Sequence, residues 1–195
     1  MSLVDRICQH FEDSVELGRV AATQLAGPIA QAVEMLTSAF DGDRKVLICG
    51  NGGSAADSQH MAAELVGRFE RERPELAAIA LSTDTSALTA VANDYGFEQV
   101  FARQVRALGR EGDVLVAIST SGESANVLAA VHAAHERGLA VVALTGRGGG
   151  SVGAALQRPD IHLCVPHDRT ARIQELHQLI IHCLCDGIDA SLLGV

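Results

Sequence analysis

Short apolar runs alternate with amphipathic stretches along most of this chain, and this alternation constrains the fold more than any other feature. Five runs rich in Val, Ile, Leu and Ala are separated by stretches whose apolar residues recur with helical spacing. Strands that read as unbroken apolar runs are buried on both faces, which is typical of a parallel sheet covered by helices. The sequence therefore predicts a doubly wound α/β fold with a five-stranded parallel sheet.

The pattern predicts where each helix and strand begins and ends, and it predicts a single domain over residues 1–195. The expected strands are 45–49, 77–81, 113–118, 139–144 and 161–165, and the expected core helices are 55–69, 85–92, 97–108, 125–137 and a long C-terminal one at 171–193. Two apolar stripes precede the first strand, and Pro28 opens the second one, as proline favours the first turn of a helix. Residues 1–42 are therefore expected to form a helical hairpin, and 43–195 the α/β core.

Composition excludes several classes of protein. The net charge is −9 with 3% aromatic residues, which argues against direct nucleic-acid binding. No apolar run reaches eighteen residues, and the charged N-terminus is unlike a signal peptide, so neither a membrane span nor export is expected. The five cysteines lack paired metal-ligand spacing and are interpreted as reduced, buried thiols. We expect a cytoplasmic protein.

Two loops rich in Gly, Ser and Thr follow expected strands and open expected helices. Ligands of open α/β sheets bind at the carboxyl ends of strands, where glycine, hydroxyls and a helix N-terminus together suit a phosphate. The alternative is that these residues only form turns and helix caps. The candidate phosphate-binding residues are Asn51, Gly52, Gly53, Ser54, Ser119, Thr120, Ser121 and Ser124.

A nicotinamide-binding site is a weaker alternative for the first loop. Gly50, Gly52 and Ala55 match the spacing of the dinucleotide fingerprint. That fingerprint also expects an acidic residue about twenty positions further on, and Asp84 comes about ten positions too late. No Gly-Lys-Ser/Thr sequence of a P-loop follows a strand.

Candidate proton carriers or metal ligands lie on two expected helices. His60 and Glu64 are four residues apart and share a helix face, so they can ligate one ion, act as acid and base, or form only an exposed pair. Gln174 and His182 are eight apart, about 12 Å along a helix, and can barely meet at one ion. If both serve one site, either they come from different subunits or Gln174 precedes the regular helix. The uncovered apolar stripes of the N-terminal region also predict association.

The chain resembles the sugar isomerase (SIS) domain family along nearly its whole length. The motifs that carry the resemblance include Cys49-Gly-Asn-Gly-Gly-Ser54, Asn93-Asp94, Ser119-Thr-Ser-Gly122, Ser124-Ala-Asn126 and Arg172-Ile-Gln-Glu175. The resemblance implies a flavodoxin-like three-layer sandwich. It also implies an aldose–ketose isomerase that converts sedoheptulose 7-phosphate to D-glycero-D-manno-heptose 7-phosphate for lipopolysaccharide synthesis.

Residue by residue, the resemblance implies a site shared between the subunits of a homotetramer. The metal ligands implied for one zinc per subunit are His60, Glu64, Gln174 and His182. The implied substrate contacts are Asn51, Gly52, Gly53, Asn93, Asp94, Ser119, Thr120, Ser121, Ser124 and Gln174, with Glu64 again. Glutamine is an unusual ligand for zinc, so we expect a weak or conditional metal.

The implied reaction needs a base and an acid on the two sides of an enediol. Glu64 is the candidate base and His182 the candidate acid. Metal ligation competes with proton transfer for the same lone pairs, and the sequence leaves open which role dominates.

A binding function is the alternative. A SIS-fold regulator that binds the replication initiator DnaA is similar in stretches such as 69–74, 104–109 and 183–189. The carboxylate and the last histidine can be replaced in such regulators. Both Glu64 and His182 are present here, which favours the enzyme.

Overall fold

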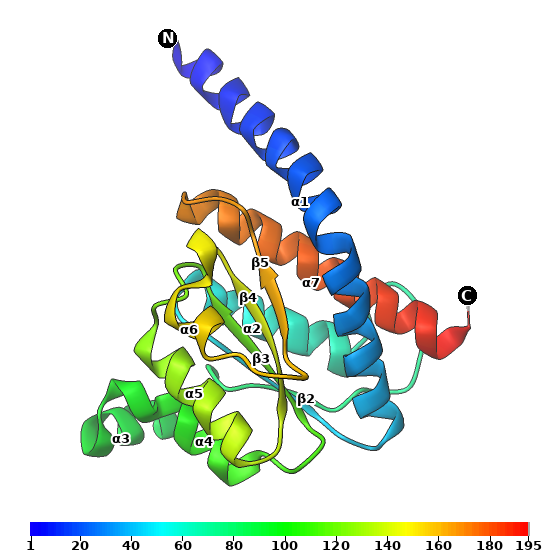
Figure 1. Cartoon of the computed structure of the whole chain (residues 1–195), viewed down its shortest axis with the longest axis vertical. Coiled ribbons are helices and arrows are strands. Elements are labelled where there is room, and N and C mark those ends of the chain that lie inside the picture. The colour runs from blue at the N-terminus through cyan, green and yellow to red at the C-terminus, as the bar shows by residue number, and fades with distance from the viewer. Residues whose placement is uncertain (195) are drawn as a thin grey trace.

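The computed structural model, which describes residues 1–194, confirms a parallel five-stranded sheet with helices on both faces (Figure 1). The strands are β1 (Val46–Gly50), β2 (Ala78–Ala80), β3 (Val114–Ser119), β4 (Ala140–Thr145) and β5 (Ile161–Cys164), in the order β2-β1-β3-β4-β5. The α-helices are α1 (Leu3–Asp41), α2 (Gly53–Val66), α3 (Thr85–Tyr95), α4 (Val100–Leu108), α5 (Ala125–Glu136), α6 (Gly150–Ala154) and α7 (Thr170–Leu193). From β1 the chain adds β2 on one side, and then β3, β4 and β5 on the other side. The crevice between the carboxyl ends of β1 and β3 is therefore the switch point where such sheets bind ligands.

Two separate cores cover the sheet because successive strand residues point to opposite faces. Ile48 of β1 packs with α1, α2 and α7 on one face, whereas its neighbour Leu47 packs with α4 and α5 on the other. All residues of β1 and β3 are buried, which explains why both strands read as unbroken apolar runs.

The N-terminal region differs from the expected hairpin, which is wrong: residues 3–41 form one helix, α1, with Pro28 inside it. The buried residues of α1 keep one helical face on both sides of the proline; they are Leu17, Ala21, Leu25, Ala32, Val33, Leu36 and Ala39. A hairpin would break this continuous stripe, which packs along α7 and the sheet. Proline removes one backbone hydrogen bond, and α1 changes direction along its length (Figure 1).

The first half of α1 extends beyond the sheet and carries uncovered apolar side chains (Figure 1). Leu3, Ile7, Phe11 and Val15 recur every four residues there and are all exposed. A stripe of this kind normally has a partner. Within residues 1–194 no helix is long and apolar enough to cross a membrane.

Smaller differences concern the ends of elements. Four of the strands begin one residue later than expected, and α2 begins at Gly53, inside the predicted loop. The short helix α6 and the 3-10 turn Arg147–Gly149 were not predicted, because their glycines read as a turn.

Candidate functional site

The two predicted loops lie side by side at the carboxyl ends of β1 and β3, and a pair of amides joins them. β1 and β3 are paired neighbours up to Gly50 and Ile118. Asn51 donates its Nδ2–H to Oδ1 of Asn126 at 2.8 Å, and Asn126 donates back to Oδ1 of Asn51 at 2.9 Å. Asn126 is buried and belongs to the motif Ser124-Ala-Asn126, but no local pattern distinguishes it from the other residues of that motif. The amide pair fixes the spacing of the loops.

The second loop leaves hydrogen-bond donors free at the start of α5. Ser124 is the N-cap of α5, yet its hydroxyl caps no backbone N–H and instead bonds Oγ of Ser119 at 2.9 Å. The first N–H groups of a helix have no partner within the helix, and they carry partial positive charge. An anion such as phosphate can bind there. Ser121 accepts the N–H of Glu123, so part of the loop does serve turn formation.

Backbone geometry explains the glycines of the first loop. Gly52 has φ +58°, which side chains disfavour. A side chain at Gly53 would overlap the amide group of Gln174, so Gln174 lies directly over the N-terminus of α2. Ser54 is buried, and a side chain at Gly50 would overlap it, which indicates a packing role for Ser54.

His60 and His182 meet although 122 residues separate them. Their Nε2 atoms are 2.9 Å apart, so one ring donates and the other accepts. Oε1 of Glu64 lies 3.7 Å from Nε2 of His60. The ring of Phe69 covers His182 at a centroid distance of 5.6 Å. The structure therefore brings together three of the four predicted metal ligands, including both predicted proton carriers.

Gln174 lies apart from this group in the same chain. Gln174 contacts Gly53, whereas His182 contacts His60. The helices α2 and α7 therefore run in the same direction, and the two contacts lie seven residues apart along α2. That separation is about 10 Å. α7 begins at Thr170, so Gln174 belongs to the regular helix and the idea that it precedes the helix is wrong.

The group fits part of a zinc site. Within residues 1–194, no cluster of three or more His, Cys, Asp and Glu side chains is arranged to hold a metal ion. Two nitrogen ligands of a tetrahedral zinc would be about 3.3 Å apart, given Zn–N distances of about 2.0–2.1 Å. The imidazoles of His60 and His182 need to separate by only a few tenths of an ångström to meet that value. Glu64 supplies an oxygen donor nearby, and a fourth ligand is not in place.

Asn93 and Asp94 are exposed on α3, and Nδ2 of Asn93 donates to Oδ1 of Asp94 at 2.8 Å. No hydrogen bond in the described part of the chain joins either residue to the two loops. Their role as substrate contacts stays a prediction.

Burial shifts the pKa of two groups around the site. His177 is fully buried, and burial lowers its pKa to about 4, although its bond to the carbonyl of Thr145 opposes the shift. His177 is therefore neutral and donates Nε2–H to that carbonyl. Burial also raises the pKa of Asp57, one turn before His60, while the charge of His60 partly offsets it. No sequence motif marks Asp57 as a site residue.

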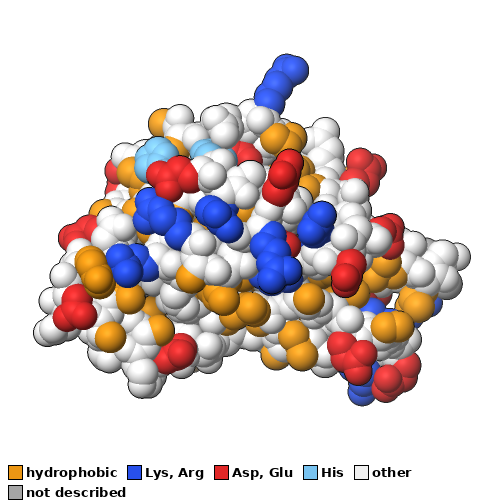
Figure 2. Space-filling view, turned by 90° about the horizontal axis from the view of Figure 1, so that it is seen from below, with side chains coloured by type: hydrophobic (Ala, Val, Ile, Leu, Met, Phe, Trp, Pro, Cys, Tyr) orange, Lys and Arg blue, Asp and Glu red, His pale blue; other side chains and the backbone are white. Residues whose placement is uncertain are grey.

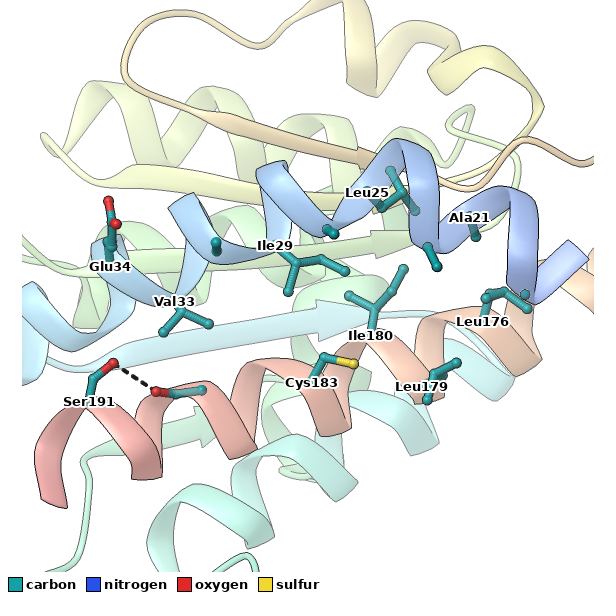
Figure 3. Close-up of a pocket in the computed structure, with 15 residues that line it drawn as sticks. Ala21, Leu25, Ile29, Val33, Glu34, Leu176, Leu179, Ile180, Cys183 and Ser191 are labelled. Atoms are coloured by element: carbon teal, nitrogen blue, oxygen red, sulfur yellow. Dashed lines mark hydrogen bonds between the residues drawn. The ribbon is translucent and has the colours of Figure 1, made fainter. Parts of the chain in front are cut away.

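An apolar groove of about 530 Å³ lies elsewhere, between α1 and α7 (Figure 3). Leu25, Ile29 and Val33 of α1 face Ile180 and Cys183 of α7 across it. None of the predicted site residues lines this groove, whose mostly apolar lining includes the polar side chains of Glu34 and Ser191.

Comparisons with known proteins agree with this geometry. Residues 9–146 match the SIS domain model. The phosphoheptose isomerase of Azoarcus sp. (strain BH72) is 65% identical over the whole chain and 99% of its own length. The structure of phosphoheptose isomerase GmhA from Neisseria gonorrhoeae is 57% identical with a TM-score of 0.93, covering 97% of this chain and all of that one. A phosphoheptose isomerase from Francisella tularensis is 48% identical with a TM-score of 0.94, covering 97% of this chain and 99% of that one.

The chain therefore belongs to the SIS domain family, as its motifs predicted. Within that family it groups with the phosphoheptose isomerases, and it is an enzyme of the isomerase class.

Proposed function

We propose that this enzyme converts sedoheptulose 7-phosphate to D-glycero-D-manno-heptose 7-phosphate, supplying heptose for lipopolysaccharide. The observation that carries the proposal is the meeting of His60, Glu64 and His182 from two helices, about 10 Å along α2 from a loop suited to a phosphate. The names of the relatives support a heptose phosphate as substrate.

The phosphate binds at the start of α5. Hydroxyls of Ser119, Thr120, Ser121 and Ser124 and the free N–H groups of α5 donate to its oxygens. The bond between Ser119 and Ser124 pre-arranges two of these hydroxyls before the substrate arrives. Asn51 and the N-terminus of α2 line the adjacent side, where Gln174 is in reach of the sugar hydroxyls.

Two proton transfers complete the isomerisation. The carboxylate of Glu64 removes a proton from C1 of the ketose while His182 donates a proton to the oxygen at C2, which gives the enediol. Glu64 then returns the proton to C2, and the C1 hydroxyl proton passes to His182 as the aldehyde forms. No other reactant is consumed. The contact with His60 orients the ring of His182 and selects its tautomer.

His60, Glu64 and His182 would hold a zinc ion, with Gln174 of another subunit as the fourth ligand. When bound, zinc supplies Lewis-acid polarisation of the C1 and C2 oxygens. We propose one weakly held zinc per subunit because a glutamine oxygen is a poor zinc ligand.

Assembly into a homotetramer with shared sites would explain three features of the single chain. The exposed stripe on the first half of α1 needs a cover. Gln174 is about 10 Å from the histidine pair along α2. Asn93 and Asp94 face outward on α3.

The deciding experiment follows aldose formation from sedoheptulose 7-phosphate by NMR, with metal-analysed protein and with added zinc. We expect turnover by the wild-type protein and its loss in His182→Ala. A folded protein that shows no turnover under either condition contradicts the proposal. A DnaA pull-down on the same sample would then test the binding alternative, which remains a prediction.

A further inference from the structure

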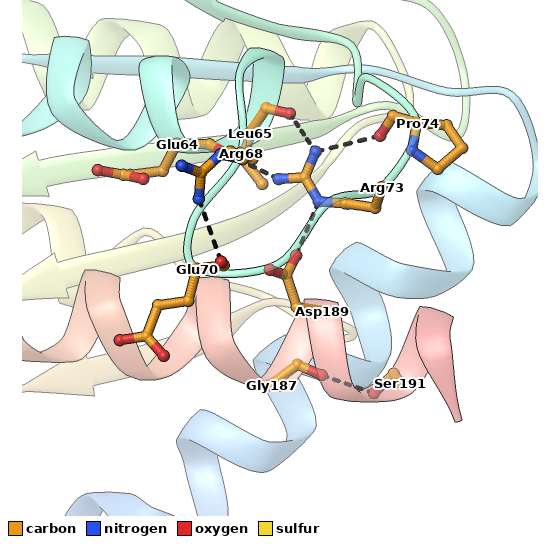
Figure 4. A network of polar contacts seen from close by, with 9 residues as sticks. All are labelled: Glu64, Leu65, Arg68, Glu70, Arg73, Pro74, Gly187, Asp189 and Ser191. Atoms are coloured by element: carbon orange, nitrogen blue, oxygen red, sulfur yellow. Dashed lines mark hydrogen bonds and ion pairs between the residues drawn. The ribbon is translucent and has the colours of Figure 1, made fainter. Parts of the chain in front are cut away.

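The segment between α2 and β2, residues 67–77, passes over the end of α2 and carries a buried side chain, Arg73, that bonds to that end (Figure 4). The guanidinium of Arg73 is 1% exposed. A buried charge is retained only when it is paired and hydrogen-bonded. Arg73 belongs to the stretch 69–74 and makes no contact with the phosphate loops.

Arg73 caps the last turn of α2, the turn that carries Glu64. Its Nη2 donates to the carbonyl of Glu64 at 2.7 Å, and its Nη1 donates to the carbonyl of Leu65 at 2.8 Å and to that of Pro74 at 3.1 Å. The last carbonyls of a helix have no partner within it. α2 has no basic residue in its last turn, so Arg73 provides this function from the following segment.

The same side chain ties α2 to α7. Nε of Arg73 donates to Oδ1 of Asp189 at 2.7 Å, and Asp189 is itself buried. Asp189 is seven residues after His182, two turns further along nearly the same face of α7. Between these helices there are thus two polar connections, the His60–His182 contact and the bridge through Arg73 (Figure 4).

A third link runs through the segment itself. Phe69, four residues before Arg73, covers the ring of His182. Fixing Arg73 therefore fixes three things at once: the end of α2 behind Glu64, the position of α7 that carries His182, and the ring that covers His182.

We propose that Arg73 is a positioning residue, which sets Glu64 and His182 at the separation that proton transfer needs. The inference rests on the proposed function, because those two residues are the proton carriers there. Lysine cannot replace Arg73, since only the planar fork reaches two carbonyls and a carboxylate in fixed directions. Misplacement of a catalytic group by about 1 Å costs on the order of 100-fold in rate.

The test compares three variants with the wild-type enzyme under saturating and limiting substrate. Arg73→Lys retains a positive charge but loses the planar guanidinium that donates to two carbonyls and a carboxylate. The double variant Arg73→Met/Asp189→Leu replaces the buried ion pair by apolar side chains, which commonly preserves folding, yet it lacks the carbonyl contacts. Lys45→Met is the matched control, because it breaks a buried ion pair with Asp113 at the opposite edge of the sheet.

We expect both Arg73 variants to lose about 100-fold in kcat, with KM within about twofold and an altered pH profile of kcat. Lys45→Met should keep the wild-type kcat and pH profile even where its unfolding midpoint falls. A double variant that folds and has wild-type kcat would show that the ion pair is only a structural tie, and would overturn the inference. If neither Arg73 variant folds while Lys45→Met does, the residue serves stability and the inference is likewise overturned. An inactive wild-type protein would instead overturn the proposed function, and this inference with it.

Discussion

The sheet has an amino edge, where its parallel strands begin, and a carboxyl edge, where they end. Both edges are polar, but their polar groups have opposite roles. At the amino edge, acceptors are filled by the chain itself: Asp113 accepts from Nζ and N–H of Lys45 and from the N–H of Arg110. Asp160 likewise accepts from His135, Val141 and Gln157. At the carboxyl edge, the N-cap side chain of α5 leaves backbone donors free, whereas in α2 the N–H groups of Ser54 and Ala55 already donate to the carbonyls of Asn51 and Gly52. The first edge is closed by its own hydrogen bonds, whereas the second offers donors to a ligand.

Surface charge does not reveal this difference. Figure 2 looks onto the end of the molecule where the strands begin and shows Lys and Arg side chains gathered across it among acidic ones. The carboxyl edge owes its proposed affinity for anions to hydroxyls and backbone N–H groups rather than to Lys or Arg. The distribution of Lys and Arg alone would therefore predict an anion site at the amino edge instead of the carboxyl edge.

The largest expected effect belongs to the carboxyl edge. Glu64→Gln removes the proposed base and should lower kcat by about 10²–10⁴-fold, with little change in unfolding midpoint. Glu111→Gln, at the amino edge, is the matched control and should retain full activity. Steady-state kinetics beside urea unfolding measures both quantities. Equal activity of the two variants would remove the distinction between the edges.

A stability loss without loss of chemistry is expected at the amino edge. Burial raises the pKa of the Asp113 carboxyl, but hydrogen bonds from Lys45 and Arg110 outweigh it and lower that pKa overall, so the group is charged at pH 7. Asp113→Ala leaves Lys45 and two N–H groups unpaired and should cost about 3–5 kcal/mol of unfolding free energy. The Asp113→Ala molecules that remain folded should convert substrate with the wild-type kcat. A drop in kcat per folded molecule would contradict this.

His177 is expected to make the packing beneath the carboxyl edge sensitive to acid. Its pKa is about 4 in the folded protein against the ordinary value of 6.5, so the unfolded chain binds a proton first as the pH falls. Stability should be intact above pH 6.5 and decrease between 6.5 and 4, by roughly 3 kcal/mol in total. Urea unfolding from pH 7 to 4 measures the slope. His177→Gln should flatten it, whereas exposed His132→Gln should not.

The smallest effect tests the phosphate loop. Ser124→Ala removes one hydroxyl donor to a charged group, worth about 1.5–3 kcal/mol, which corresponds to a roughly tenfold to hundredfold rise in KM. Ser38→Ala, beside Asp113 at the amino edge, should leave KM unchanged. Competition by inorganic phosphate gives a second measure, since Ser124→Ala should weaken it as well. Equal inhibition constants would mean that the phosphate binds elsewhere.

Much of the fold was predictable because burial patterns are local. Residues 46–50 and 114–119 are buried on both sides, so apolar runs identify the strands without further information. The predicted N-terminal hairpin is wrong because Pro28, a strong local signal for a helix start, lies inside one continuous apolar stripe. That stripe runs in phase from Leu17 to Ala39, and packing against α7 retains the helix despite the missing hydrogen bond.

The sequence by itself determined the sheet and the two loops, since spacing and motif are properties of neighbouring residues, and its resemblance to the SIS family supplied the candidate site residues, whose roles stay predictions. Only the tertiary structure decided which of those residues meet. It placed His182 against His60 and Gln174 against Gly53, and it showed Arg73 at the end of α2. The physical reason is that helix spacing fixes faces along one element, whereas the contact between α2 and α7 depends on how both pack on one sheet.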